Sequence, residues 1–243
     1  MLRSHKFNWA ELDRWTLFEM LYSAKDKVVK VPLSAYNFHE VIVRHIKSQL
    51  PVKASRIYDS KVDPGCTWVG GCYYSDLDAE YLQCIEINFC YHGKKDIITI
   101  SDYRFKRMCL LFADTMLHEI IHMRQFRKRK FKHLPDYAST AHREKQRREQ
   151  EYLGNNDEID AYAFNIACEM LTKAEYDPQK AIRLLNEDQK GRRRKSTCWL
   201  VYLNAFSHDH NHPIIKRMKK RIAYYLPKAE RGRPFRSCDW ITR

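Results

Sequence analysis

Hydrophobic residues at helical spacing open the chain. Residues 8–24 place apolar side chains roughly on one helical face: Trp9, Leu12, Leu17, Met20 and Leu21. Apolar positions three and four residues apart favour a helix, because 3.6 residues make one turn. Ser34 suits the N-cap of a second helix, which would continue to Leu50 and be stopped by Pro51. The first fifty residues are therefore predicted to form two helices.

The pattern changes to strands between residues 55 and 92. β-Branched and aromatic residues gather there in the runs 56–58, 67–69, 72–74 and 81–91. Residues 85–89 alternate between apolar and polar side chains, which is typical of a strand with one wet face. Gly70 and Gly71 separate two of the runs, so a hairpin turn is predicted there. One further short strand is predicted at residues 97–100.

Helical spacing returns in the second half of the chain. Ser101 or Asp102 is predicted to cap a long helix over residues 103–129, and Asp157 to open another over residues 158–173. The polar stretch between these helices is predicted to be a loop with a short helix. Three more helices are predicted over residues 178–189, 196–206 and 213–226.

The order of these elements indicates the fold class. Helices come first, a small antiparallel sheet follows, and helices end the chain, which is an α+β layout. A chain of 243 residues is one large domain or two small ones, and we expect a single domain over residues 1–243. Within it we distinguish N-terminal helices (1–52), a core (53–175) and C-terminal helices (176–243).

The sequence His118-Glu119-Ile120-Ile121-His122 carries the clearest chemical signal. Two histidines at positions i and i+4 share one face of a helix, so both imidazoles can reach a single Zn²⁺. Glu119 would point toward a water on the metal and take its proton as general base. The apolar residues before the motif indicate a core helix. The alternative is a chance pair of satisfied histidines with a salt-bridging glutamate.

A catalytic zinc site needs a third protein ligand. Glu158 is the favoured candidate, because it lies in the first turn of a predicted helix and the small Ala161 one turn later allows close approach to the motif helix. Asp157 and Asp160 stay open as alternatives, since acidic residues are favoured at any helix N-terminus. More distant candidates are His133 and His142. The longer H-E-x-x-H-x-x-G-x-x-H pattern is absent, because Gln125 stands where its glycine would.

The HExxH motif followed by Glu158-x-x-Ala161 resembles the gluzincin metallopeptidases, most closely their compact cytosolic or bacteriophage-encoded type. The resemblance covers about half of the chain, residues 55–172. It implies a zincin-like fold, in which a small antiparallel sheet packs on the HExxH helix and an edge strand pairs with substrate. The run from Cys84 to Cys90 is the candidate for that strand.

The same resemblance implies the roles of the site residues. His118, His122 and Glu158 would bind one Zn²⁺ per chain, and Glu119 would be the catalytic base. Many gluzincins carry an aspartate four residues after the ligand glutamate, where this chain has Tyr162. Two other residues could substitute for that aspartate beside the metal ligands: Asp160 and Asn165.

Peptide hydrolysis also needs a group that stabilises the oxyanion. We take Tyr162 as the second catalytic residue beside Glu119. The alternatives are Tyr152, Tyr137 and the alternating His208, His210 and His212. Nothing in the sequence chooses among them, and the alternating histidines equally suit a solvated loop.

Composition indicates the compartment. No run approaches the about 18 apolar residues that a membrane helix needs, and the N-terminus has no apolar leader segment. The eight cysteines contain no C-x-x-C pair, which argues against zinc-ribbon and thioredoxin sites. We therefore expect a cytoplasmic protein with no membrane partner, located in the host cytoplasm or the virion if it is phage-encoded.

The chain is strongly basic, with 44 Lys and Arg against 30 Asp and Glu and a net charge of +14. Between Arg124 and Arg148, ten basic residues accompany two acids. A second block consists of Arg192, Arg193, Arg194 and Lys195, and a third runs from Lys216 to Arg221. Such clusters could contact nucleic acid or an acidic partner, although charge runs are usually solvated faces.

The sequence thus predicts a zinc-dependent metallopeptidase, a hydrolase that cleaves peptide bonds in a protein or peptide substrate through a metal-activated water. Two alternatives stay open. One is a non-catalytic zinc-containing protein whose basic surface binds nucleic acid. The other is a phage structural protein with an inactive zincin core.

Overall fold

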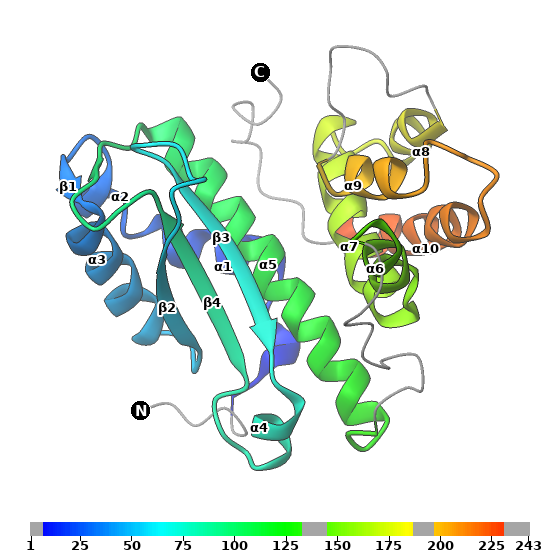
Figure 1. Ribbon diagram of the computed structural model, residues 1–243, viewed down its shortest axis with the longest axis horizontal. Coiled ribbons are helices and arrows are strands. Elements are labelled where there is room, and N and C mark those ends of the chain that lie inside the picture. The colour runs from blue at the N-terminus through cyan, green and yellow to red at the C-terminus, as the bar shows by residue number, and fades with distance from the viewer. Residues whose placement is uncertain (1–6, 133–144, 187–196, 231–243) are drawn as a thin grey trace. The chain divides into compact units, whose positions relative to one another are not determined.

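The computed structural model describes residues 7–132, 145–186 and 197–230, and these residues form helices and small sheets (Figure 1). The predicted α+β class is confirmed. The chain divides into two compact units, Met1–Phe131 and Lys132–Arg243. A single domain over the whole chain stays a prediction.

The first unit opens with short helices. They are η2 (Trp9–Glu11), α1 (Arg14–Tyr22), α2 (Lys25–Val28) and α3 (Ala35–Lys47). The first predicted helix is interrupted, because Asp13 is extended and its side chain caps α1 by accepting from the N–H groups of Trp15 and Thr16. Ser34 caps α3 as predicted, and α3 ends three residues before Leu50.

A three-stranded sheet lies at the centre of this unit. Its strands are β2 (Lys53–Tyr58), β3 (Thr67–Tyr73) and β4 (Ile85–Tyr91), in the order β2–β4–β3. β4 pairs antiparallel with β3 but parallel with β2. The prediction of an antiparallel sheet therefore holds for β3 with β4 and is wrong for β2. A parallel pair needs a crossover connection, and β3 with the short helix α4 (Ser75–Ala79) lies within that connection.

The glycine pair and the edge strand were also assigned wrongly. Gly70 and Gly71 lie inside β3, opposite Asn88 and Ile87 of β4, and form no turn. β4 is the central strand, so the run from Cys84 to Cys90 offers no free edge. The central position suits the alternation of β4, whose inward side chains are fully buried: Ile85, Ile87, Phe89 and Tyr91.

A second, two-stranded sheet joins β1 (Leu33–Ser34) to β5 (Ile97–Ile98) in antiparallel register. The strand predicted at residues 97–100 is thus confirmed over its first half. It joins the segment before α3 to the segment before α5 (Asp102–Lys128), the long helix of this unit.

Helix α5 agrees with the predicted long helix to within one residue at each end. Its N-cap is Ser101, whose side chain accepts from the N–H of Arg104. Figure 1 shows α5 running along one face of the sheet, next to β3. Near its end, Arg127 donates to both carboxylate oxygens of the buried Asp78 at 2.7 and 2.5 Å, which fixes α5 to α4.

The described part of the second unit is helical. Its helices are α6 (Lys145–Gly154), α7 (Asn156–Lys173), α8 (Pro178–Asn186), α9 (Thr197–Ala205) and α10 (Pro213–Glu230). They enclose a core that includes Ile166, Met170, Trp199 and Ile222. All five correspond to predicted helices, and α10 extends beyond the predicted end. Among the described residues, no helix combines the length and apolar character needed to cross a membrane.

A buried histidine makes the first unit sensitive to acid. His39 of α3 is 4% exposed, and its Nδ1 lies 3.3 Å from the Tyr91 hydroxyl. Burial and, to a smaller extent, the charge of the nearby Arg56 lower the pKa of His39 to about 4, while Glu40 opposes both. The imidazole is therefore neutral in the folded protein at pH 7.

We expect the first unit to lose stability as the pH falls from about 6.5 to about 4, because the unfolded state then binds a proton at His39 that the folded state excludes. The loss should be on the order of 2 kcal/mol. His39→Gln keeps a hydrogen-bonding side chain and removes the titration. Urea unfolding at several pH values should show a shallower pH dependence for that variant, and an unchanged one would contradict this role.

Candidate metal centre

The three motif residues are buried on α5. His118, Glu119 and His122 are 8%, 6% and 7% exposed. The two histidine Nε2 atoms lie 3.1 Å apart, and the ring centroids are 4.8 Å apart. Two nitrogens at about 2.0–2.1 Å from a tetrahedral metal would be separated by about 3.4 Å. The spacing of the pair therefore fits one shared ion.

A neighbouring amide orients the second histidine. Nδ1 of His122 lies 3.0 Å from Oε1 of Gln125. Because an amide oxygen only accepts hydrogen bonds, Nδ1 is the protonated nitrogen and Nε2 keeps its lone pair for a metal. Gln125, which the sequence marks only as a departure from the longer zinc motif, is thus a partner of the site.

A buried ion pair holds α5 one turn before the motif. Arg14 of α1 donates to both carboxylate oxygens of Asp114 at 2.7 and 2.8 Å. Both residues are buried, so the charge of each is compensated by the other. Sequence reasoning missed this pair. A lone aspartate within an apolar stretch of helix was the signal that could have found it.

Strand β3 passes very close to Glu119. A Cβ atom added at Gly71 would lie 2.8 Å from Cγ2 of Thr115 and 2.9 Å from both Cγ and Oε1 of Glu119. Only glycine leaves room at this point for the carboxylate. The adjacent Gly70 faces open space, with nothing within 4 Å of an added Cβ. Gly71 is therefore part of the wall around Glu119, a role that the predicted hairpin turn concealed.

The expected third ligand lies in the first turn of α7. The Asn155 side chain caps this helix by accepting from the N–H of Asp157 at 2.8 Å. Glu158 is 4% exposed, and Ala161 one turn later is fully buried. His118, His122 and Glu158 are all buried, and each can offer one ligand atom to a metal ion. This group could hold a metal ion.

The alternative acids have other positions. Asp160 accepts hydrogen bonds from the Tyr225 hydroxyl at 2.8 Å and from the Arg221 guanidinium, so its carboxylate fastens α10 to α7. Asp157 is buried, but within the described residues the metal-holding group includes Glu158 and neither aspartate. The remaining candidate ligands, His133 and His142, lie outside the described residues.

Three tyrosines from three helices gather near Glu158: Tyr152 of α6, Tyr162 of α7 and Tyr202 of α9. The rings of Tyr162 and Tyr202 are 5.6 Å apart. Partial burial raises the pKa of Tyr152, whose side chain is still 48% exposed, and the charge of Glu158 together with hydrogen bonding to Glu158 and Tyr162 raises it further. Burial and the charge of Glu158 also raise the pKa of Tyr202. These phenols therefore stay protonated and can donate hydrogen bonds.

The Tyr202 hydroxyl is buried and has no hydrogen-bond partner among the described residues. A buried hydroxyl in that state is destabilising. Tyr137, another candidate for the oxyanion, lies outside the described residues.

The alternating histidines serve the connection between α9 and α10. Nε2 of His208 lies 2.9 Å from Oδ1 of Asn204. His210 contacts the Trp199 ring edge-on. The His212 ring packs on Phe206 with centroids 4.6 Å apart, and its Nδ1 accepts from the N–H of Ile214. These contacts account for the run as a structured loop, and none of the three belongs to the metal-holding group found in the described residues.

Comparisons with protein-family models, with curated proteins and with solved structures find no match to this chain. An inferred function therefore rests on the buried group of His118, His122 and Glu158.

Gly71→Ala is expected to destabilise the first unit by about 1–3 kcal/mol and to displace Glu119, because the added methyl group overlaps the Thr115 and Glu119 side chains. Gly70→Ala is the matched control, since it places the same atom one residue away in open space. Urea unfolding of both variants measures the difference. Equal stability of the two variants would contradict the close approach of β3 to Glu119.

Proposed function

We propose that this protein is a zinc-dependent metallopeptidase. The observation that carries the proposal is the buried group of two imidazoles and one carboxylate, with Glu119 beside the two histidines on the same helix. Two histidines and a glutamate are a ligand set of catalytic zinc sites, and three protein ligands leave the fourth tetrahedral position open for water or substrate.

Glu119 is the proposed general base. When bound, a zinc ion would lower the pKa of a water at its open position to near 7 and polarise the carbonyl of the scissile bond. Glu119 would accept the proton of the attacking water and then deliver it to the leaving amine nitrogen. The contact with Gly71 supports this role, because it restricts the positions that the carboxylate can take.

Strand β3 is the proposed binding edge for the substrate. It pairs with β4 on one side, and no other described strand pairs with it. Its free backbone N–H and C=O groups could hold an extended peptide as an added strand. Gly71 brings this edge next to Glu119, so a peptide bound there would lie beside the base.

The tyrosines near Glu158 are proposed to stabilise the oxyanion. Tyr162 stays our candidate for this role, and Tyr152 is the alternative, because hydrogen bonding links it to both Tyr162 and Glu158. A phenol that donates to developing negative charge is the electrophilic group that peptide hydrolysis requires.

Zinc analysis tests the ligand set. We expect one zinc per wild-type chain by elemental mass spectrometry and a sharp loss in Glu158→Ala, because two histidines alone form an incomplete site. Glu149→Ala, an exposed glutamate on α6, is the control and should keep its zinc. A folded wild-type protein that takes up no zinc when zinc is supplied would overturn the proposal.

Glu119→Gln separates catalysis from metal binding. The variant should keep its zinc and its fold but lose at least about 100-fold in the rate of hydrolysis of a denatured protein, since the amide cannot accept the proton. Glu80→Gln, at an exposed position, should remain fully active. An unchanged rate in Glu119→Gln would exclude the base role. A zinc-loaded wild type that cleaves no member of a peptide library would favour a non-catalytic protein.

A further inference from the structure

Helix α10 has two contrasting faces. Four of its apolar residues are buried in the core of the second unit: Ile215, Met218, Ile222 and Leu226. On the outer face, Lys216, Lys220, Tyr224 and Lys228 follow one another at four-residue steps, and all four are exposed. Residues 213–229 contain no acidic side chain. The outer face is therefore a row of cations with one aromatic ring.

The cations beside this row bind side chains of neighbouring helices. Arg217 donates to Oδ1 of Asn156 at 2.7 Å, Lys219 donates to Oδ1 of Asn186 at 3.0 Å, and Arg221 pairs with Asp160. These contacts hold α10 on its neighbours in the second unit.

The three lysines of the outer row differ from their neighbours. Lys216, Lys220 and Lys228 make no ion pair with any described residue. A row of like charges without compensation repels itself, and binding an anion relieves that repulsion. The row is thus available to a partner.

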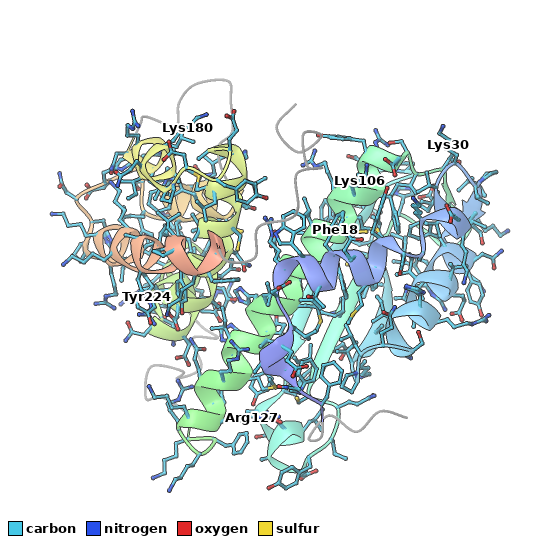
Figure 2. All side chains as sticks on the ribbon, turned by 180° about the vertical axis from the view of Figure 1, so that it is seen from behind. Phe18, Lys30, Lys106, Arg127, Lys180 and Tyr224 are labelled. Atoms are coloured by element: carbon cyan, nitrogen blue, oxygen red, sulfur yellow. The ribbon has the colours of Figure 1, made fainter. Side chains whose placement is uncertain are left out.

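Tyr224 gives the row a second kind of contact. Its side chain is 51% exposed, and Figure 2 shows it on α10. The Lys228 ammonium lies 3.6 Å from the centre of its ring, and the Arg221 guanidinium lies 4.7 Å from that centre. Hydrogen bonding and charge from Lys228 lower the pKa of the phenol. The exposed ring therefore lies among cations.

We propose that the outer face of α10 binds single-stranded nucleic acid, with Lys216, Lys220 and Lys228 contacting phosphates and Tyr224 stacking on a base. Lys216 and Lys228 are twelve helical steps apart, which is about 18 Å and covers several phosphates of one strand. An aromatic ring within a row of cations is the combination that binds single strands without sequence preference.

Other anionic partners fit this face less well. A membrane surface is bound by a basic helix that also exposes apolar side chains, and among the large side chains this face offers only Tyr224. A protein interface needs a buried apolar centre, which a row of lysines does not provide. The proposal concerns α10 alone and does not rest on the proposed peptidase activity.

The test is fluorescence anisotropy of a labelled oligothymidylate of about 20 nucleotides with the full-length protein, at several salt concentrations. The variant K216E/K220E/K228E should bind at least about tenfold more weakly, and its salt dependence should be shallower by a slope of about 2. The control K27E/K47E/K95E makes the same change in net charge at exposed lysines of the first unit and should stay within about threefold of wild type.

Tyr224→Ala tests the stacking separately. It should weaken binding about fivefold or more and leave the salt slope unchanged, because no charge is removed. Tyr103→Ala, at a similarly exposed tyrosine of α5, is its control and should bind like wild type. Circular dichroism and the Tm confirm that each variant is folded.

Two outcomes overturn the proposal. The first is an equal loss of affinity in the two triple-lysine variants, which would make binding a property of net charge alone. The second is binding to phosphatidylserine vesicles without binding to the oligonucleotide, which would assign the face to a membrane surface.

Discussion

Burial of polar side chains on α5 is the constraint on which the candidate site depends. A helix packed between α1 and β3 would ordinarily carry only apolar residues at these positions, because each buried polar group must find a partner. Asp114 meets Arg14, and Gln125 holds His122. The core around α5 is therefore arranged to keep charged and titratable groups in fixed positions, which is the condition for a preorganised reactive site.

Local features of the sequence predicted most helices and the histidine pair. Ser34 and Ser101 cap helices as expected, because capping depends on residues within one turn. The His118–His122 spacing follows from helix geometry in the same way. The sheet could not be predicted equally well. The parallel pairing of β2 with β4 joins segments about thirty residues apart, and no local signal specifies it.

The rest of the site could not be predicted, because it depends on contacts between segments that are distant in sequence. Three acids share the start of α7, and the sequence favours Glu158 but leaves the other two open, whereas the structure engages Asp160 with Arg221 and Tyr225 of α10. For Gly71 the sequence predicted a turn, but the residue lies where two segments approach closely. Glycine is common both in turns and where backbones approach closely, and only the packing of β3 on α5 distinguishes the two.

The ion pair between Arg14 and Asp114 has a consequence for how the protein is made. Its partners are 100 residues apart in sequence. During synthesis, α1 emerges from the ribosome long before the segment that it packs against, and domains generally complete their folding only as whole units. The first unit therefore completes its folding late, when residue 114 becomes available. A nascent chain shorter than that exposes both the apolar face of α1 and the guanidinium of Arg14, which Asp114 has yet to bind.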